Sequence, residues 1–124
     1  MLEHQALTDR VIGLAIEVHR TLGPGLLDSV YAGCLGYELE AHGIPFEREA
    51  AVAVAYKDAV FPFGFRADFV VAGAVLVEVK AVAEVVPAHK SQILTYLRMS
   101  GIRVGLLMNF HAPRLKDGLL RFIV

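Results

Sequence analysis

Two charged residues, Glu78 and Lys80, lie inside the segment AVLVEVKAV, residues 74–82, whose other members are all apolar. Such a composition is typical of a strand that is buried on both faces. An unpaired charge in that position costs several kcal/mol. Because side chains alternate along a strand, Glu78 and Lys80 point to one face, while Val77 and Val79 point to the other. The two charged groups are therefore expected to act together.

A third candidate, Asp68, belongs to the segment that precedes this strand. A hairpin that turns near Ala72-Gly73 would bring Asp68 beside Glu78. Two adjacent carboxylates repel each other unless a cation lies between them, and oxygen ligands suit a hard ion such as Mg²⁺ or Mn²⁺. Lys80 could stabilise the negative charge of a phosphoryl transition state or orient a metal-activated water. The three residues together favour hydrolysis of a phosphodiester.

A structural interpretation stands beside this one. Asp68, Glu78 and Lys80 on neighbouring strands can also form an ion network in which Lys80 is the counter-ion of Glu78. For a bare D…ExK pattern this alternative carries more weight, because short patterns recur by chance. The order of the elements around the pattern has to decide between the two.

Two helices are expected first. Thr8 is a candidate N-cap for a helix that runs to about Thr21, and Gly23-Pro24-Gly25 ends it. A second helix is expected from about Leu27 to His42, with Gly43 as its C-terminal glycine. The residues of this second helix that are expected to face the core are Val30, Tyr31, Cys34, Leu35 and Leu39.

The pattern then changes to strands. FEREAAVAVAY, AVFPFGFRADFVV and AVLVEVKAV are separated by turn signals at Lys57-Asp58 and Ala72-Gly73, which predicts a three-stranded meander. Pro87 suits the start of a helix that reaches Ser100, with Gly101 as its stop. The strand IRVGLLMNF and an edge strand in GLLRFIV follow. A strand, a crossover helix and a strand pair in parallel, so we expect an α/β fold with a mixed sheet flanked by helices.

Composition excludes several classes of protein. A length of 124 residues predicts one domain over 1–124. Despite a mean hydropathy of +0.53, every apolar run is too short for a membrane span, and no signal peptide is recognised, so we expect a cytoplasmic protein with no membrane partner. Cys34, the only cysteine, rules out an internal disulfide and is expected to pack in the core. The net charge of -1 provides no general attraction to nucleic acid.

With Asp68, Glu78-Val79-Lys80 and the αβββαβ order in place, the chain resembles the PD-(D/E)xK nuclease superfamily, whose core is restriction-endonuclease-like. It is most similar to the small GxxExxY proteins within that superfamily. The resemblance covers nearly the whole chain. The segments that carry it are IGLAIEVHRTLGPGLLDSVY, FRADFVV, VLVEVKAV and HKSQILTYLRMSGIRVGLLMNF.

The resemblance implies that Asp68 and Glu78 are ligands of Mg²⁺ or Mn²⁺, that the carbonyl of Val79 is a third ligand, and that Lys80 is the catalytic lysine. Gln92-x-x-x-Tyr96 is similar to the QxxxY motif of RecB-like exonucleases. His89, Gln92 and Tyr96 are spaced to share one helix face. A core position for Tyr96 and a solvated helix-start position for His89 are equally open.

One position departs from the motif that names the family. The pattern would read Gly25-x-x-Glu-x-x-Tyr31, but Asp28 stands at the acidic position. Aspartate is shorter by a methylene, so Asp28 is a candidate metal ligand with reduced reach. Alternatively, Asp28 stabilises the start of the helix through the macrodipole or as a cap.

The leading expectation is thus a metal-dependent nuclease that acts on DNA in preference to RNA. The alternative is a non-catalytic nucleic-acid-binding or assembly module that keeps the fold. Since the domain lacks a separate DNA-binding segment, a homo-oligomer or a partner protein is expected to help it hold its substrate.

Overall fold

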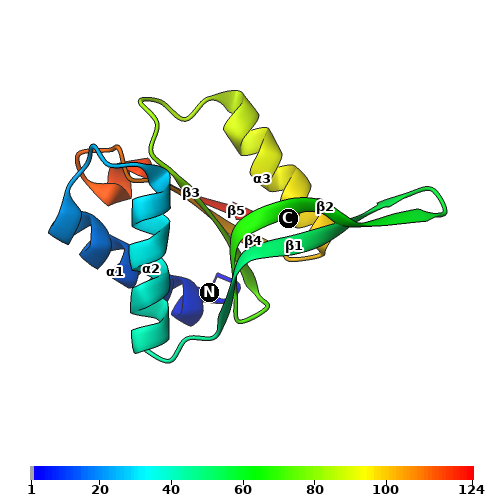
Figure 1. The fold of residues 1–124 in the computed structure, drawn as a ribbon, viewed down its shortest axis with the longest axis horizontal. Helices are drawn as coiled ribbons and strands as arrows, with labels where there is room; N and C mark the ends of the chain where they lie inside the picture. The colour runs from blue at the N-terminus through cyan, green and yellow to red at the C-terminus, as the bar shows by residue number, and fades with distance from the viewer. Residues whose placement is uncertain (1) are drawn as a thin grey trace.

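The computed structural model describes residues 2–124 as two helices followed by a five-stranded sheet, with a third helix between the third and fourth strands (Figure 1). Within these residues no helix is long and apolar enough to cross a membrane. The elements are α1 (Gln5–Leu22), α2 (Asp28–Ala41), β1 (Phe46–Tyr56), β2 (Ala59–Val71), β3 (Val75–Lys80), α3 (Pro87–Ser100), β4 (Val104–Asn109), the short 3-10 helix η1 (Leu115–Gly118) and β5 (Leu119–Ile123).

The strands lie in the sheet in chain order, β1-β2-β3-β4-β5. β3 and β4 are parallel and are joined by α3, and the other neighbours are antiparallel. The predicted mixed sheet is confirmed. Parallel neighbours need a long crossover connection, which α3 supplies between β3 and β4. Tight turns join β1 to β2 and β2 to β3, and a longer connection with η1 joins β4 to β5.

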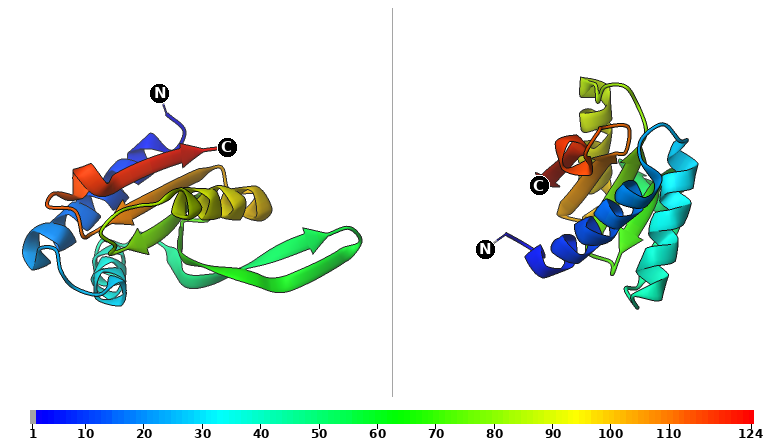
Figure 2. Two further views of the ribbon diagram at one scale, coloured as in Figure 1. Left: turned by 90° about the horizontal axis from the view of Figure 1, so that it is seen from above. Right: turned by 90° about the vertical axis from the view of Figure 1, so that its left-hand side faces the viewer.

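The helices cover opposite faces of the sheet, with α1 and α2 on one side and α3 on the other (Figure 2). Val77 and Val79 pack towards α1 and α2, and Leu76 packs towards α3. β3 is therefore buried on both faces, as its composition predicted. The smaller core under α3 consists of Ala67, Leu76, Ile93, Leu97 and Leu107.

Several boundaries agree with the sequence predictions because the local chemistry is strong. The backbone at Lys57, Ala72 and Gly73 has positive φ angles of 53°, 51° and 64°, as tight hairpin turns require. α3 begins at Pro87 and ends before Gly101, whose φ of 76° lies in the left-handed region that favours glycine. The backbone preferences of the turn residues favour these boundaries, and at Ala72 the amide also donates to the Pro45 carbonyl (2.8 Å).

Two predictions about the first helices are wrong. Thr8 is not an N-cap, because α1 begins earlier, at Gln5. Thr8 is buried inside the helix, where its hydroxyl donates to the Gln5 carbonyl (3.1 Å) and accepts from Arg121 of β5 (2.6 Å). Val30 does not face the core and is 41% exposed, since Tyr31, the next residue of α2, takes the buried position. Cys34 is partly buried and packs against the core, as expected.

β1 and β2 extend well beyond the rest of the sheet (Figure 1). Within β2, only the last residues, from Phe69 to Val71, pair with β3. The outer part of the hairpin, residues 51–66, is called the arm below. Inside the arm, Val52 pairs with Phe65 but Val54 pairs with Phe61, so the extra residues of this bulge lie on β2. Gly64 belongs to the bulge, and a Cβ there would overlap the side chain of Val54.

Tyr31 fastens the loop between α1 and α2. Its hydroxyl donates to the Gly23 carbonyl (2.5 Å) and accepts from the Leu26 amide (3.1 Å). Its ring is fully buried and stacks on Phe110 at 4.6 Å between centroids and 14° between planes. Gly25 in the same loop has a φ of 106°, a conformation that other residues rarely adopt. Tyr31 therefore sets where α2 begins.

We expect Tyr31→Phe to lower the free energy of unfolding by about 1–3 kcal/mol, because the partly buried Leu26 amide and Gly23 carbonyl both lose their partner. Urea unfolding followed by circular dichroism measures the change. Tyr37→Phe is the matched control, since Tyr37 lies on the same helix and is 73% exposed. Equal stability of the two variants would contradict a fastening role for the Tyr31 hydroxyl.

Candidate functional site

β2 and β3 separate at Asp68 and Glu78, and the two side chains bridge the gap. The last regular pair before the gap is Phe69 with Val77. Beyond it, the Val79 amide donates to Asp68 Oδ2 (2.7 Å), and the Asp68 amide donates to Glu78 Oε1 (3.4 Å). Each carboxylate thus accepts a backbone hydrogen bond from the opposite strand. The expectation that the hairpin brings Asp68 beside Glu78 is confirmed.

Glu78 is only 5% exposed. The pKa of Glu78 is raised from 4.5 to about 8, first by burial and next by the nearby charge of Asp68, while the charge of Lys80 opposes the change with a smaller effect. Desolvation and a like charge both disfavour the ionised form. Ionising both Asp68 and Glu78 therefore costs electrostatic free energy, and a nearby cation would offset that cost.

Lys80 lies two residues after Glu78, at the end of β3, and is half-buried. The ion pairs formed by residues 2–124 are Arg20–Glu17, His42–Glu38, Arg103–Glu3 and Arg114–Asp117. A direct ion pair does not neutralise Glu78 in this part of the chain. Lys80 acts on Glu78 through its field alone.

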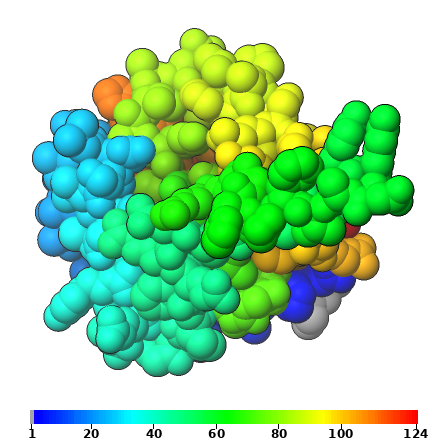
Figure 3. Space-filling view, turned by 45° about the vertical axis from the view of Figure 1, so that its right-hand side comes forward, coloured from blue at the N-terminus to red at the C-terminus, as the bar shows by residue number. Residues whose placement is uncertain are grey.

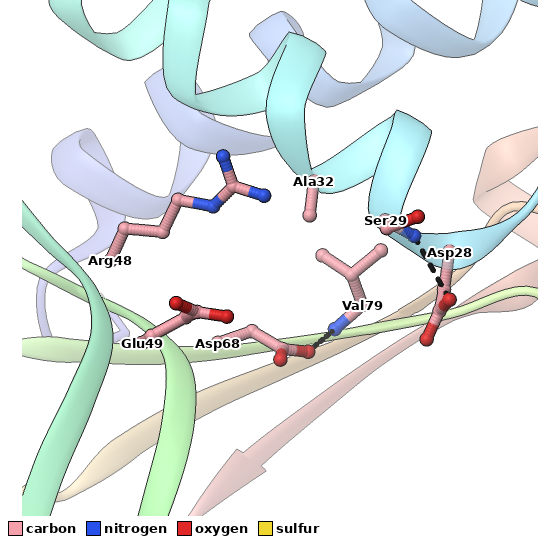
Figure 4. Close-up of a pocket in the computed structure, with 7 residues that line it drawn as sticks. All are labelled: Asp28, Ser29, Ala32, Arg48, Glu49, Asp68 and Val79. Atoms are coloured by element: carbon pink, nitrogen blue, oxygen red, sulfur yellow. Dashed lines mark hydrogen bonds between the residues drawn. The ribbon is translucent and has the colours of Figure 1, made fainter.

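A cavity of about 160 Å³ opens on the α2 side of this gap. Asp68 and Val79 line its floor, and the start of α2 and the base of β1 line its walls (Figure 4). Asp28 is among the lining residues, so the first acidic position of the motif and Asp68 share one cavity. The lining residues are Asp28, Ser29, Ala32, Arg48, Glu49, Asp68 and Val79.

Asp28 is the first residue of α2. Its Oδ1 accepts a hydrogen bond from the Ser29 amide (2.9 Å), which leaves Oδ2 for another partner (Figure 4). A carboxylate in the first turn also interacts favourably with the helix dipole. Asp28 is not the N-cap, because Leu27 occupies that position. The interaction with the helix dipole and a role as metal ligand are compatible, because one carboxylate oxygen bonds within the first turn while the residue borders the cavity.

Sequence reasoning missed two charged residues of the cavity, Arg48 and Glu49. Arg48 pairs with Phe69 and Ala50 pairs with Ala67, so Glu49 stands opposite Asp68. Its φ of 52° is unusual for a residue in a strand. The pairing register of β1 with β2 and the positive φ at Glu49 cannot be predicted from the sequence, because FEREAA is typical of the polar start of an edge strand.

On the other face of the sheet, Tyr96 of α3 stacks on Phe65 with ring centroids 3.7 Å apart and planes at 8°. Burial raises the pKa of Tyr96, and the charges of Glu78 and Asp68 raise it further, so Tyr96 is electrostatically coupled to both acids. Gln92, one turn earlier, is exposed. His89 accepts a hydrogen bond from the Val86 amide (3.1 Å) through Nδ1 and so caps the helix.

The donor set fits a hard divalent cation. Within residues 2–124 no three side chains of Asp, Glu, His or Cys lie close enough together to form a metal site. Mg²⁺ commonly takes one or two carboxylates and completes its shell with water and substrate oxygens. Asp68 and Glu78, with Glu78 buried beside a like charge, meet that smaller requirement.

A comparison with protein families agrees with this geometry. The model of the PD-(D/E)XK nuclease superfamily matches residues 5–122. No curated protein matches the chain, and no solved structure does. The matched range includes both helices before the sheet, the separated strands and α3.

The raised pKa of Glu78 predicts how stability depends on pH in the presence of EDTA. Between pH 4.5 and about 8 the folded chain keeps a proton on Glu78 that the unfolded chain has released. The stability from this group is therefore complete below pH 4.5 and is lost as the pH rises towards 8. Urea unfolding at several pH values measures the decline.

Glu78→Gln should remove this component, because glutamine stays neutral. Glu40→Gln is the control, since Glu40 is exposed on α2 and should leave the pH dependence unchanged. A wild-type chain that becomes more stable over this pH range, with the same slope in Glu78→Gln, would contradict the assignment.

Proposed function

Because the chain belongs to the PD-(D/E)XK nuclease superfamily, we propose that it is a metal-dependent nuclease which hydrolyses phosphodiester bonds, in DNA rather than RNA. We further propose that residues 1–124 form a single nuclease-like domain of the GxxExxY type. The left-handed Gly25 and the buried, doubly hydrogen-bonded Tyr31 support the latter, since both give that motif a structural purpose.

The observation that carries the proposal is the gap between β2 and β3. A structural pair of acids would be expected to have a basic partner in contact. Here Asp68 and Glu78 instead hold each other's strands through backbone amides, and Asp68 borders an open cavity. This arrangement holds two carboxylates in place before any ligand arrives, as catalytic groups require.

Mg²⁺ or Mn²⁺ would be held by Asp68 and Glu78 together with the carbonyl of Val79, and Asp28 would contribute from the opposite wall of the cavity. When bound, such an ion polarises the phosphoryl group and lowers the pKa of a coordinated water.

The remaining roles belong to the protein's own groups. The Val79 amide orients the Asp68 carboxylate by its 2.7 Å hydrogen bond. Lys80 stabilises the negative charge that develops on the phosphoryl oxygens. Tyr96, held flat by Phe65, and Gln92 on the exposed side of α3 contact the nucleic acid. Together the groups bring charge stabilisation and orientation to one end of β3.

The alternative is a non-catalytic nucleic-acid-binding module. One observation favours it: a carboxylate oxygen of Asp28 is already engaged by the Ser29 amide. If Asp28 serves only its helix, the site has one acid fewer and would hold a metal ion less tightly. Binding of nucleic acid without cleavage would then be the whole activity.

We expect Lys80→Ala to lower the cleavage rate at least about 100-fold, because charge stabilisation in the transition state is lost. Single- and double-stranded DNA and RNA are incubated with Mg²⁺, with Mn²⁺ or with EDTA, and products are resolved on gels. Lys90→Ala is the control, since Lys90 is exposed on α3. Intact substrates with the wild-type chain and both metals, alongside retained binding, would establish the non-catalytic alternative instead.

Asp28 gives a second test. Asp28→Ala should weaken Mn²⁺ binding about 10-fold, while Asp28→Glu, which restores the acidic residue of the motif, should bind at least as tightly as the wild type. Isothermal titration calorimetry measures both affinities. Asp9→Ala removes an exposed aspartate of α1 as the control. Unchanged affinity in Asp28→Ala would assign Asp28 to the helix alone.

A further inference from the structure

The outer part of the arm (residues 51–66) projects from the molecule (Figure 3) and carries exposed apolar side chains, whereas Phe65 at its base stacks on Tyr96 of α3. A two-stranded hairpin is marginally stable in water unless something packs on it. The charged residues of the arm are Arg66 at its base and Lys57 and Asp58 at its tip. Because Lys57 and Asp58 have opposite charges, the tip has no net charge that would attract a polyanion. The large exposed side chains are Tyr56, Val60, Phe61 and Phe63, the last being 77% exposed.

The outer edge of β1 is open, because β1 is the first strand of the sheet and pairs only with β2. The residues along it, 50–55, read AAVAVA, with no charge and no proline. Edge strands usually carry charges, prolines or bulges that prevent further pairing. In this hairpin the extra residues of the bulge and Pro62 lie on β2, and the positive φ in β1, at Glu49, lies outside residues 50–55. β1 is therefore the edge that can accept another strand.

The sequence of β1 is complementary to itself when read in the opposite direction. Around Ala53, the segment AVAVA of residues 51–55 is a palindrome. In an antiparallel pair of two such strands about a two-fold axis, Val52 stands opposite Val54. Ala50 stands opposite the exposed Tyr56, a small residue facing a large one.

The charges beyond the two ends of this pairing also match. Beyond the strand residues 50–56, Glu49 and Arg48 of one copy lie near Lys57 and Asp58 at the tip of the other. Lys57 and Asp58 form the hairpin turn and Glu49 has a positive φ, so these are contacts at the ends of the pairing and not pairs within the ladder. Both contacts join opposite charges, and each occurs twice about the axis. Facing like charges would oppose the pairing, whereas these favour it and set its register.

We propose that two copies of this chain associate through β1, antiparallel and centred on Ala53, to form one continuous sheet. The open edge, the palindrome and the charge pairs each support a second copy as the occupant. The pairing carries the tip of each arm back to the base of β1 in the other copy, so the tips no longer project into water.

The same pairing places the tip of one copy at the cavity of the other. Arg48 and Glu49, which line the cavity beside Asp68, meet Asp58 and Lys57 of the second copy. Each tip thus forms part of the cavity's rim and supplies charge there. The association goes beyond the proposed nuclease function and does not depend on it, because it rests on β1 alone.

Sedimentation velocity over a range of protein concentrations tests the association. We expect the wild type to be a dimer. Ala53→Lys and Ala53→Glu should each be monomeric, because residue 53 faces its own copy and like charges then meet at the axis. Tyr37→Lys places the same charge on an exposed position of α2 and should remain dimeric. Circular dichroism establishes that every variant is folded.

An equimolar mixture of Ala53→Lys and Ala53→Glu should recover the dimer, since opposite charges then meet. Similarly, Lys57→Glu should weaken association at least about 10-fold, and Lys57→Glu combined with Glu49→Lys should restore it. A monomeric wild type would overturn the proposal, as would a dimer that persists in both Ala53 variants. Protection of the 51–55 amides from hydrogen exchange only on addition of DNA or of another protein would also overturn it.

Discussion

The electrostatic cost of keeping two carboxylates in the gap between β2 and β3 is the constraint on which the rest of the site depends. Asp68 and Glu78 replace the backbone ladder at that point by hydrogen bonds of 2.7 and 3.4 Å to the opposite strands. Burial and mutual repulsion then raise the pKa of Glu78 to about 8. The same contacts that join the strands thus leave a negative site that a divalent cation would stabilise.

The two helices before the sheet supply the other wall of that site. Tyr31 bonds to the loop that precedes α2 and stacks on Phe110, which follows β4. It thereby ties the start of α2, and Asp28 with it, to the end of the sheet where β3 and β4 finish. A buried tyrosine that serves only packing would not need both backbone partners. The Tyr31 side chain thus both stabilises the fold and positions Asp28.

The arm follows a different logic. Several of its large apolar side chains are exposed, and within one chain β1 contacts chiefly β2 and α3. AAVAVA is a typical sequence for a strand inside a sheet. On an open edge, the same uncharged sequence leaves backbone groups free to pair with another strand. Self-pairing would resolve this conflict and would bring charged groups to a cavity that otherwise has one arginine, Arg48, among three acids.

The sequence by itself determined the order of elements, because strong local signals specify it. Pro87, Gly101 and the turns at Lys57 and Gly73 act through their own backbone preferences, and the hairpin necessarily brings Asp68 near Glu78. Two other predictions were wrong: Thr8, predicted as an N-cap, lies inside α1 and is bonded by Arg121 from the far end of the chain, and Val30, predicted to face the core, is 41% exposed.

Only the tertiary structure decided what surrounds the two acids. The gap between β2 and β3, the left-handed backbone at Glu49 and the approach of Arg48 all arise from strand registers, which leave no local pattern in the chain. Burial of β3 likewise depends on α3 on one face of the sheet and α1 with α2 on the other. The charge of a residue is written in the sequence, but its pKa depends on neighbours that come together only when the chain folds.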